Sequence, residues 1–180
     1  MKLTILGSCS GTEPMPNRQH TSYVIEQDGG VYWFDAGEGC SYTAHLLGID
    51  ILAIRALFIS HPHLDHVGGL VNLLGTMRKL EGRNTEPARS LSGRTIPVYI
   101  PNLRVWEGAL SVLAGPKESP YPGFETDAQT YTDGAIFDDN TLRVTALHNR
   151  HLGEPPEGEP WQSFSFSIGS HNANIKFTFM

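Results

Sequence analysis

Three histidines and an aspartate lie within six residues, in the segment His61-Pro62-His63-Leu64-Asp65-His66. Imidazole nitrogens and carboxylate oxygens are the usual non-sulfur ligands of zinc. Pro62 restricts the backbone between the first two histidines, so less conformational entropy is lost when both side chains are presented to an ion. The chain has only 8 histidines in 180 residues. Their clustering therefore favours a metal site over a solvated loop that is rich in histidine by chance.

The elements on either side of this segment would hold it in place. The apolar, β-branched run Ile54–Ser60 directly precedes it and predicts a buried strand. The apolar residues that follow recur at helical spacing and predict a helix over Val67–Leu80. A loop between the end of a strand and the start of a helix is where an α/β sheet commonly places its chemistry.

Other segments predict further strands and helices in alternation. Helices are expected at Ser41–Leu47 and Leu103–Leu113, and Tyr121–Asn140 is expected to be irregular, with at most short strands. Gln27-Asp28-Gly29-Gly30 is a hairpin signal. The remaining strands are expected at Lys2–Leu6, Ser22–Glu26, Val31–Phe34, Ile96–Ile100, Leu142–Ala146, Phe164–Ile168 and Ile175–Phe179. This order predicts a mixed α/β (α+β) domain in which helices flank sheets.

Composition indicates one soluble domain with an ordinary core, at 39% hydrophobic and 18% charged residues. Cys9 and Cys40 are too few for a disulfide framework and suit a reducing cytoplasm. The apolar part of the first seven residues is too short for a signal peptide, and no apolar run is long enough to span a membrane. We therefore expect a cytoplasmic protein without a membrane partner. The net charge of −6 argues weakly against general nucleic-acid binding.

One stretch, Arg78–Arg94, is basic within this acidic chain. It follows the predicted motif helix, so it could reach a phosphate-bearing substrate near a metal. The alternative is a solvated helix end followed by a polar loop, because Lys and Arg favour helix C-termini. We favour the second interpretation, since most charge runs are solvated surface.

A metal held by the His-rich loop needs a further ligand from elsewhere, because two or three neighbouring side chains leave zinc under-coordinated. His148 and His151 are the candidates. Alternation places His148 on the apolar face of the strand Leu142–Ala146, so it could be a buried core histidine. His151 lies beyond that strand, in a loop. His20 could lie near the same pocket, but we expect a surface histidine there.

The segment HPHLDH resembles the H-x-H-x-D-H signature of the metallo-β-lactamase superfamily. Two glycine-containing segments, Leu6–Pro14 and Phe34–Gly39, are similar to those of its ribonuclease Z-like branch. The resemblance covers the whole chain in order. It implies an αββα sandwich, of which this chain would hold the N-terminal portion. Residues 1–180 would then form a single metallo-β-lactamase-like domain that is incomplete at its C-terminus.

The resemblance also assigns roles to individual residues. It implies that His61, His63 and His151 bind one metal ion, since the family spacing lands on His151 rather than His148. Asp65 and His66 would bind a second ion. Asp35 would support the metal loop by orienting a histidine ligand instead of binding metal itself.

The chain departs from the family after the strand Ile175–Phe179. Family members carry there an "S/T-G-D" segment whose aspartate bridges two metals, whereas this chain stops at Met180. The substrate arm of ribonuclease Z, expected between Phe164–Ile168 and Ile175, is also missing, which argues against a transfer RNA substrate. We further expect an exposed apolar surface that favours aggregation or a homodimer, because four alternating phenylalanines would lose neighbours: Phe164, Phe166, Phe177 and Phe179.

The expected function is metal-dependent hydrolysis. One or two zinc ions, or manganese or iron, would lower the pKa of a bound water to about 7 and supply hydroxide. Asp65 would act as the catalytic residue that orients or deprotonates the nucleophile. The resemblance favours a small-molecule or nucleotide phosphodiester substrate, with a thioester or lactam as alternatives. Because only Asp65 and His66 would hold the second metal, we expect weak or no activity, and a non-catalytic metal-binding remnant is the competing class.

Overall fold

The computed structural model describes residues 1–13, 15–114, 124–172 and 176–179. Its first sheet has six strands in the order of the chain. The first three are antiparallel, and the strands from β3 to β6 are parallel. They are β1 (Lys2–Gly7), β2 (Ser22–Gln27), β3 (Gly30–Phe34), β4 (Ile54–Phe58), β5 (Thr95–Tyr99) and β6 (Glu125–Gln129).

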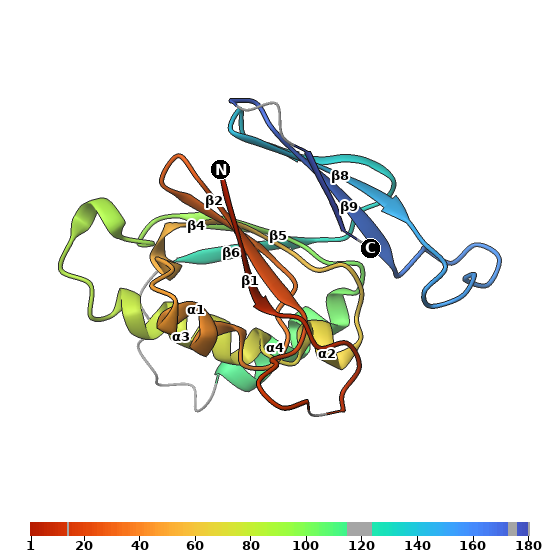
Figure 1. Cartoon of the computed structure of the whole chain (residues 1–180), viewed down its shortest axis with the longest axis horizontal. Helices are drawn as coiled ribbons and strands as arrows, with labels where there is room; N and C mark the ends of the chain where they lie inside the picture. The colour runs from red at the N-terminus through yellow and green to blue at the C-terminus, as the bar shows by residue number, and fades with distance from the viewer. Residues whose placement is uncertain (14, 115–123, 173–175, 180) are drawn as a thin grey trace.

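A second, antiparallel sheet of four strands has the order β10-β9-β8-β7. Its strands are β7 (Gly134–Asp138), β8 (Leu142–His148), β9 (Phe164–Ser170) and β10 (Lys176–Phe179). Figure 1 shows this sheet (cyan to blue) facing one side of the six-stranded sheet, with the helices on the other side. The layers are thus helices, sheet and sheet.

The helices of the outer layer are amphipathic and bury one face on the six-stranded sheet. They are α1 (Cys40–Leu46), α3 (Leu70–Glu81) and α4 (Leu103–Ala114), while the four-residue α2 (Leu64–Val67) lies in the His-rich segment. Two short 3₁₀ helices, η1 (Ile51–Ala53) and η2 (Pro87–Arg89), lie in loops. Among the described residues, none of the helices has the length and apolar character needed to cross a membrane.

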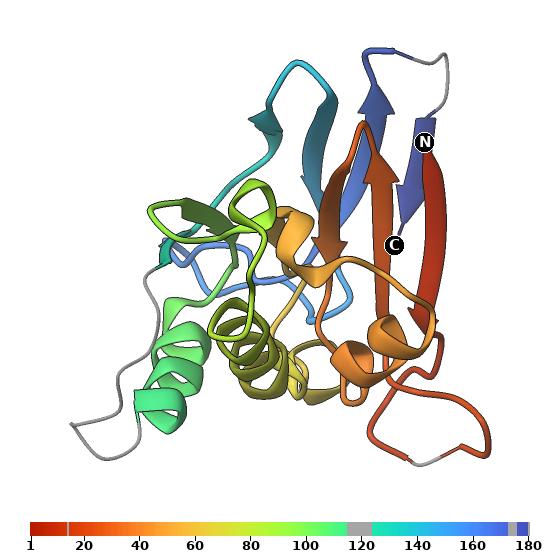
Figure 2. The ribbon, with the colours of Figure 1, turned by 90° about the vertical axis from the view of Figure 1, so that its left-hand side faces the viewer.

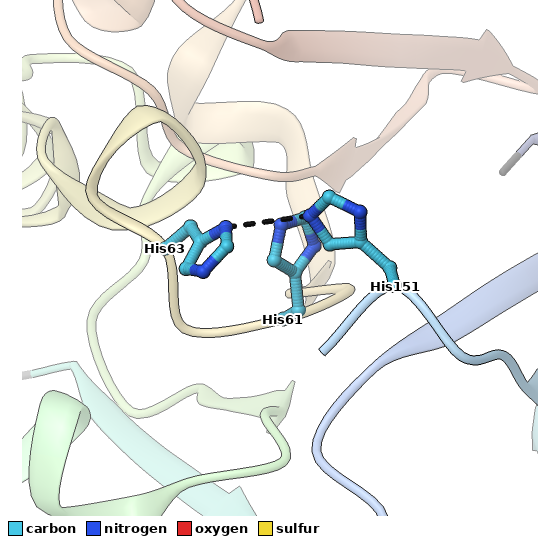
Figure 3. Close-up of side chains that lie close together, drawn as sticks. All are labelled: His61, His63 and His151. Atoms are coloured by element: carbon cyan, nitrogen blue, oxygen red, sulfur yellow. Dashed lines mark hydrogen bonds between the residues drawn. The ribbon is translucent and has the colours of Figure 1, made fainter. Parts of the chain in front are cut away.

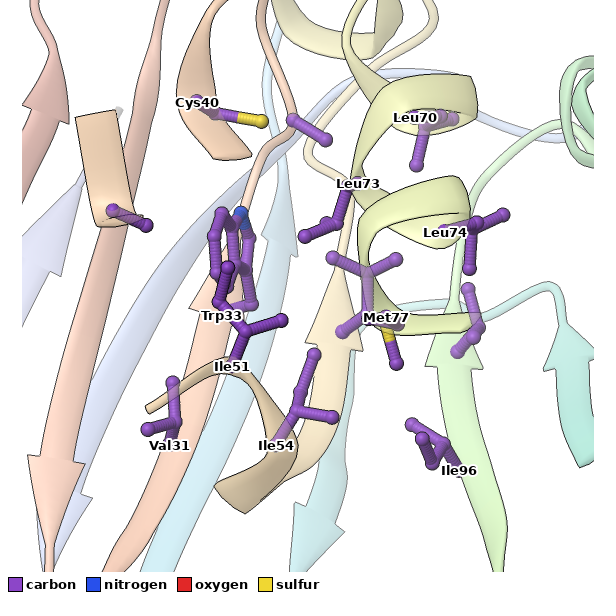
Figure 4. Close-up of a cluster of buried hydrophobic side chains, with 14 of the residues drawn as sticks. Val31, Trp33, Cys40, Ile51, Ile54, Leu70, Leu73, Leu74, Met77 and Ile96 are labelled. Atoms are coloured by element: carbon purple, nitrogen blue, oxygen red, sulfur yellow. The ribbon is translucent and has the colours of Figure 1, made fainter. Parts of the chain in front are cut away.

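Two apolar clusters hold the layers together. The first lies between the helices and the six-stranded sheet, where Trp33 of β3 faces Leu73 and Met77 of α3 (Figure 4). The second lies between the two sheets and is rich in aromatic rings. Phe34 and Phe58 stack there with ring centroids 4.7 Å apart, and Phe166 of β9 meets both rings edge-on.

This second cluster corrects one prediction. Phe164 and Phe166 do not lose their neighbours, because they are only 2% and 1% exposed between the sheets. The second sheet covers the face that we expected to be bare. Met180 and the side chains of Phe177 and Phe179 lie outside the described part of the structure. Self-association therefore stays a prediction.

The structure also corrects one predicted helix. The helix predicted over Val67–Leu80 is broken at Gly68-Gly69, because the Gly69 amide donates to Ala36 O at 2.7 Å. A Cβ on Gly69 would lie 2.2 Å from the carbonyl oxygen of Gly37, so only glycine fits this approach. Short strands were allowed in the segment Tyr121–Asn140, and its described part contains two of five residues each, β6 and β7. Both strands lie at sheet edges, where polar residues are common, so the segment lacks the apolar pattern that predicts a strand.

Candidate metal centre

The His-rich loop begins where β4 ends, at the same edge of the sheet as the end of β3. The two strands are parallel, with Phe34 opposite Phe58. Asp35 directly follows β3, and its backbone amide donates to Phe58 O at 2.8 Å. This brings the Asp35 carboxylate beside the first residues of the His-rich loop. The parallel pairing of β3 with β4 thus brings Asp35 beside the His-rich loop, although the two are far apart in the sequence.

Three histidines meet at this edge. His61 and His63 come from the loop after β4, and His151 comes from the loop after β8 in the other sheet (Figure 3). One ring nitrogen of each lies within 4.8 Å of the others. His63 Nδ1 and His151 Nε2 are 3.3 Å apart. The cluster therefore joins the two sheets at one end of the sandwich.

His148, the alternative candidate, has other partners. Its Nδ1 pairs with Asp133 Oδ2 at 2.7 Å, and its ring stacks on Trp161 with centroids 4.1 Å apart. The backbone amide of His148 also donates to Asp133 Oδ1 at 2.6 Å. The structure thus commits His148 to this pair and brings His151 to the cluster.

His61 has the chemistry that a metal ligand needs. It is 6% exposed, and its Nε2 is buried without a hydrogen-bond partner among the described residues. Burial, and then the nearby rings of His66, His151 and His63, lower the pKa of His61 to about 3. The ring is therefore neutral at physiological pH and can offer a lone pair. A buried nitrogen without a partner costs free energy, and a bound cation would remove that cost. The donor set therefore fits a metal ion.

Asp35 and Ser60 orient the rings. The buried Asp35 carboxylate accepts from the Ser60 amide at 2.7 Å and from the Ser60 hydroxyl at 2.8 Å. It also accepts from His66 Nδ1 at 2.8 Å, while Ser60 Oγ lies 3.0 Å from His61 Nδ1. When the two imidazoles are neutral, this network assigns the ring proton to Nδ1 in each, which leaves Nε2 as an acceptor. Burial opposes a charge on His66, but the hydrogen bond and charge of Asp35 outweigh it and raise the pKa of His66.

Asp65 and His66 face a second position. Asp65 Oδ2 lies 3.5 Å from His66 Nε2 and accepts from the Gly11 amide at 2.6 Å. Burial alone would raise the pKa of Asp65, but the Gly11 hydrogen bond and the charge of His66 outweigh it, and the pKa is lowered. Asp65 is therefore ionised near neutral pH. The described residues thus bring three donors to one position and two to the other.

Two contributors to this site were not predicted. Ser60 links Asp35 to His61, and its only sequence signal is its place between the strand and the first histidine. The Gly11 amide donates to Asp65, and its sequence signal is the glycine-containing segment Leu6–Pro14, to which no contact with the site was assigned. The prediction of a surface position for His20 is wrong. Its side chain is 13% exposed because it packs against Gly37.

A cavity of about 720 Å³ opens above these groups. Its wall is shared by the N-terminal loop, the His-rich loop and the ends of β8 and β9. The lining residues are Ser10, Gly11, Thr21, Ser60, His61, His63, Asp65, His66, Asn149, His151, Ser163, Phe164 and Ser165. Such a volume suits a small-molecule ligand or part of a larger one.

A family model described as the metallo-beta-lactamase superfamily matches residues 15–149, which is most of the chain. The chain belongs to the metallo-beta-lactamase superfamily. Within it, ribonuclease Z of Treponema denticola is 43% identical over 157 residues, which cover 87% of this chain and 50% of that protein. Ribonuclease Z of Treponema pallidum is 44% identical over 70 residues, which cover 39% of this chain and 22% of that protein. Both relatives are named ribonuclease Z, and the chain spans at most about half the length of either.

Solved structures show the same fold. The short form of human tRNase Z (ELAC1) has a TM-score of 0.71 at 24% identity, over 99% of this chain and 68% of that chain. The metallo-beta-lactamase fold protein YhfI from Bacillus subtilis has a TM-score of 0.67 at 15% identity, over 98% of this chain and 61% of that one. The predicted metallo-β-lactamase fold is therefore confirmed.

Proposed function

We propose that this protein is a metal-dependent hydrolase that cleaves phosphodiester bonds in RNA or nucleotides, with zinc bound by His61, His63 and His151. One observation carries the proposal. His61 Nε2 is buried without a partner among the described residues, in a cluster with ring nitrogens of His63 and His151. Three imidazoles with an open fourth position are a known arrangement for catalytic zinc.

When bound, the metal would supply Lewis acidity and make a coordinated water more acidic. The other tasks belong to side chains of this chain. Asp35 and Ser60 hold the rings of His61 and His66 at their Nδ1 atoms, which leaves the Nε2 atoms for the metal. The ionised Asp65 keeps one oxygen on the Gly11 amide and can use its carboxylate to orient the attacking water and take its proton.

The substrate class rests on the relatives. Those cited above are named ribonuclease Z, and the solved neighbour is named tRNase Z. Ribonucleases act on phosphodiester bonds, so this is the bond that we assign. A cytoplasmic location is part of the proposal, supported by two cysteines that are both free and buried.

The proposal is tested with metal-loaded protein on two substrates, bis(p-nitrophenyl) phosphate and a precursor transfer RNA. We expect turnover that a chelator abolishes and that added Zn²⁺ or Mn²⁺ restores. His63→Ala should remove it, whereas His45→Ala, an exposed position on α1, should not. Turnover that persists in a chelator, or in His63→Ala, would contradict the proposal.

A metal-binding protein without catalysis is the second candidate. The observation that favours it is the second position, where the described residues bring only Asp65 and His66 together. A site with two protein ligands holds a metal poorly. Stoichiometric metal binding without turnover on either substrate would favour this candidate.

A further inference from the structure

A second cleft, of about 570 Å³, lies at the other end of β4. Three arginines line it from three separate segments. Arg55 comes from β4, Arg89 from η2, and Arg94 from the loop before β5. The turn between β2 and β3 closes one side through Gly29. Two of these arginines belong to the basic stretch Arg78–Arg94, which the metal centre does not use.

Arg94 is the arginine of this cleft whose charge is held by backbone carbonyls. It is partly buried, and its guanidinium donates to two backbone carbonyls, Leu52 O at 3.3 Å and Ile54 O at 2.5 Å. No carboxylate in the described part of the chain forms an ion pair with it. Burial and the nearby charge of Arg55 lower the pKa of Arg94, and the charge of Glu81, which forms no direct ion pair with Arg94, opposes this shift only in part. A partly desolvated cation without a directly bound carboxylate is costly, and a bound anion would offset that cost.

Arg55 is only loosely neutralised. Its one described acidic partner is Asp139, with Arg55 NH1 and Asp139 Oδ2 3.7 Å apart. That carboxylate is already engaged, since Oδ2 accepts from the Tyr32 hydroxyl at 2.6 Å. Its Oδ1 accepts from the amides of Thr141 at 3.0 Å and Leu142 at 2.9 Å. Most of its capacity is therefore spent on these donors, and the Arg55 guanidinium keeps free N–H groups.

Arg89 is fully neutralised by two carboxylates, Asp50 and Glu86, with Glu86 Oε1 3.4 Å from Arg89 NH1. Its Nε and NH2 donate to the two oxygens of Asp50 at 2.9 and 2.8 Å, in a bidentate arrangement. The cleft lining thus has Arg55, Arg89 and Arg94 against Asp50 and Asp139, an excess of one positive charge. This excess is concentrated on Arg55 and Arg94.

We propose that this cleft is an anion site that takes a phosphate monoester group, held by Arg55 and Arg94. Planar guanidinium groups match the oxygens of phosphate and can bind two at once. His61 is six positions after Arg55 in the sequence, and an extended chain covers roughly 20 Å over that number of steps. Figure 1 shows the loop after α3 at the left and α2 at the right, at opposite ends of the six-stranded sheet, and the end with the loop faces the viewer in Figure 2. The site is therefore distinct from the metal centre and does not depend on the proposed hydrolase activity.

The test uses the full chain after treatment with a chelator, so that a metal ion cannot hold the phosphate. Inorganic phosphate, adenosine 5′-monophosphate and adenosine are each titrated by calorimetry at constant ionic strength. We expect saturable binding of phosphate or the monophosphate and none of adenosine. Tighter binding of the monophosphate would assign the anion to a nucleotide, and equal binding would assign it to free phosphate.

Variants locate the site. Arg94→Ala and Arg55→Ala should each weaken binding by about tenfold or more, the cost of one charge-assisted hydrogen bond. Arg94→Lys keeps the charge, should fold as the wild type does, and should still weaken binding because the bidentate geometry is lost. Arg83→Ala is the matched control, since Arg83 is exposed on the same loop but does not line the cleft. Absence of saturable binding in the wild type, or equal binding in wild type and folded Arg94→Lys and Arg55→Ala, would overturn the proposal.

Discussion

The Asp35 carboxylate accepts a hydrogen bond from His66 Nδ1 at 2.8 Å, which joins the end of β3 to α2. Asp35 adopts a left-handed backbone conformation, with φ at 53°. This conformation costs an L-residue about 1–2 kcal/mol. The Asp35 amide bonded to Phe58 O and the carboxylate bonded to Ser60 hold the residue there. The strained turn thus aims one buried carboxylate at both Ser60 and His66.

Replacing this carboxylate should weaken metal binding without removing a metal ligand. Asp35→Asn keeps the size of the side chain but loses the charge that holds Ser60, and through Ser60 the ring of His61. We expect zinc affinity to fall by about 10–100-fold, as is usual when the partner of a histidine ligand is lost. Competition with a chromophoric chelator measures the affinity. Asp127→Asn, at an exposed position on β6, is the control, and equal affinities in the two variants would contradict this role.

The choice between His148 and His151 is directly testable. We expect His151→Ala, and the double variant His61→Ala/His63→Ala, to lose tightly bound metal. His148→Ala should keep it, because its imidazole pairs with Asp133 and not with the cluster. Metal content after dialysis, measured by mass spectrometry, distinguishes the outcomes. Metal lost from His148→Ala and kept in His151→Ala would reverse the assignment.

The buried carboxylate of Glu81, outside the metal centre, should make the free energy of unfolding depend on pH. Burial opposes its charge, but donors from the Leu91 amide and the Ser90 hydroxyl outweigh it and lower the pKa of Glu81. A lowered pKa in the folded state means that the charged form stabilises the fold above the unfolded carboxyl pKa of about 4.3. This stability is lost as the pH falls through the folded pKa.

We therefore expect Glu81→Gln to be less stable than the wild type at pH 7, with a difference that shrinks as the pH falls below about 4. Urea unfolding at several pH values measures the free energy of unfolding of each protein. Glu107→Gln, an exposed position on α4, should show no such trend. A difference that stays constant between pH 7 and pH 3 would show that the charge of Glu81 is not responsible.

Two glycines of α3, one at its N-cap and one in its interior, predict opposite effects on stability. Gly69→Ala would place a Cβ 2.2 Å from Gly37 O, and we expect a loss of about 1–3 kcal/mol from the resulting shift. Gly75→Ala on α3 would meet only Leu113 Cδ2, at 3.7 Å. Alanine should stabilise that helix by roughly 0.5–1 kcal/mol. Thermal and denaturant unfolding measure both changes, and a stable Gly69→Ala would refute the close approach.

The His-rich loop could be located from the sequence because its setting is local. An apolar run of strand character ends at Ser60, and six residues of metal-binding types follow. The strand predicted over Ile54–Ser60 is β4, Ile54–Phe58, and the periodic residues after it form α3. Such patterns depend on neighbours within a few residues, so they predict a strand or helix without knowledge of the tertiary contacts.

Only the tertiary structure decided which groups complete the site. His63 and His151 are 88 residues apart, and His148 lies only three residues before His151. Hydrophobic periodicity does not separate the two candidates, and only the spacing known from the family favoured His151. The packing of one sheet on the other selects His151. The same holds for the break at Gly68-Gly69 and for the basic stretch, which lies at the opposite end of β4 from the metal centre. These outcomes depend on contacts between distant segments, and a sequence pattern carries no information about which distant backbone comes close.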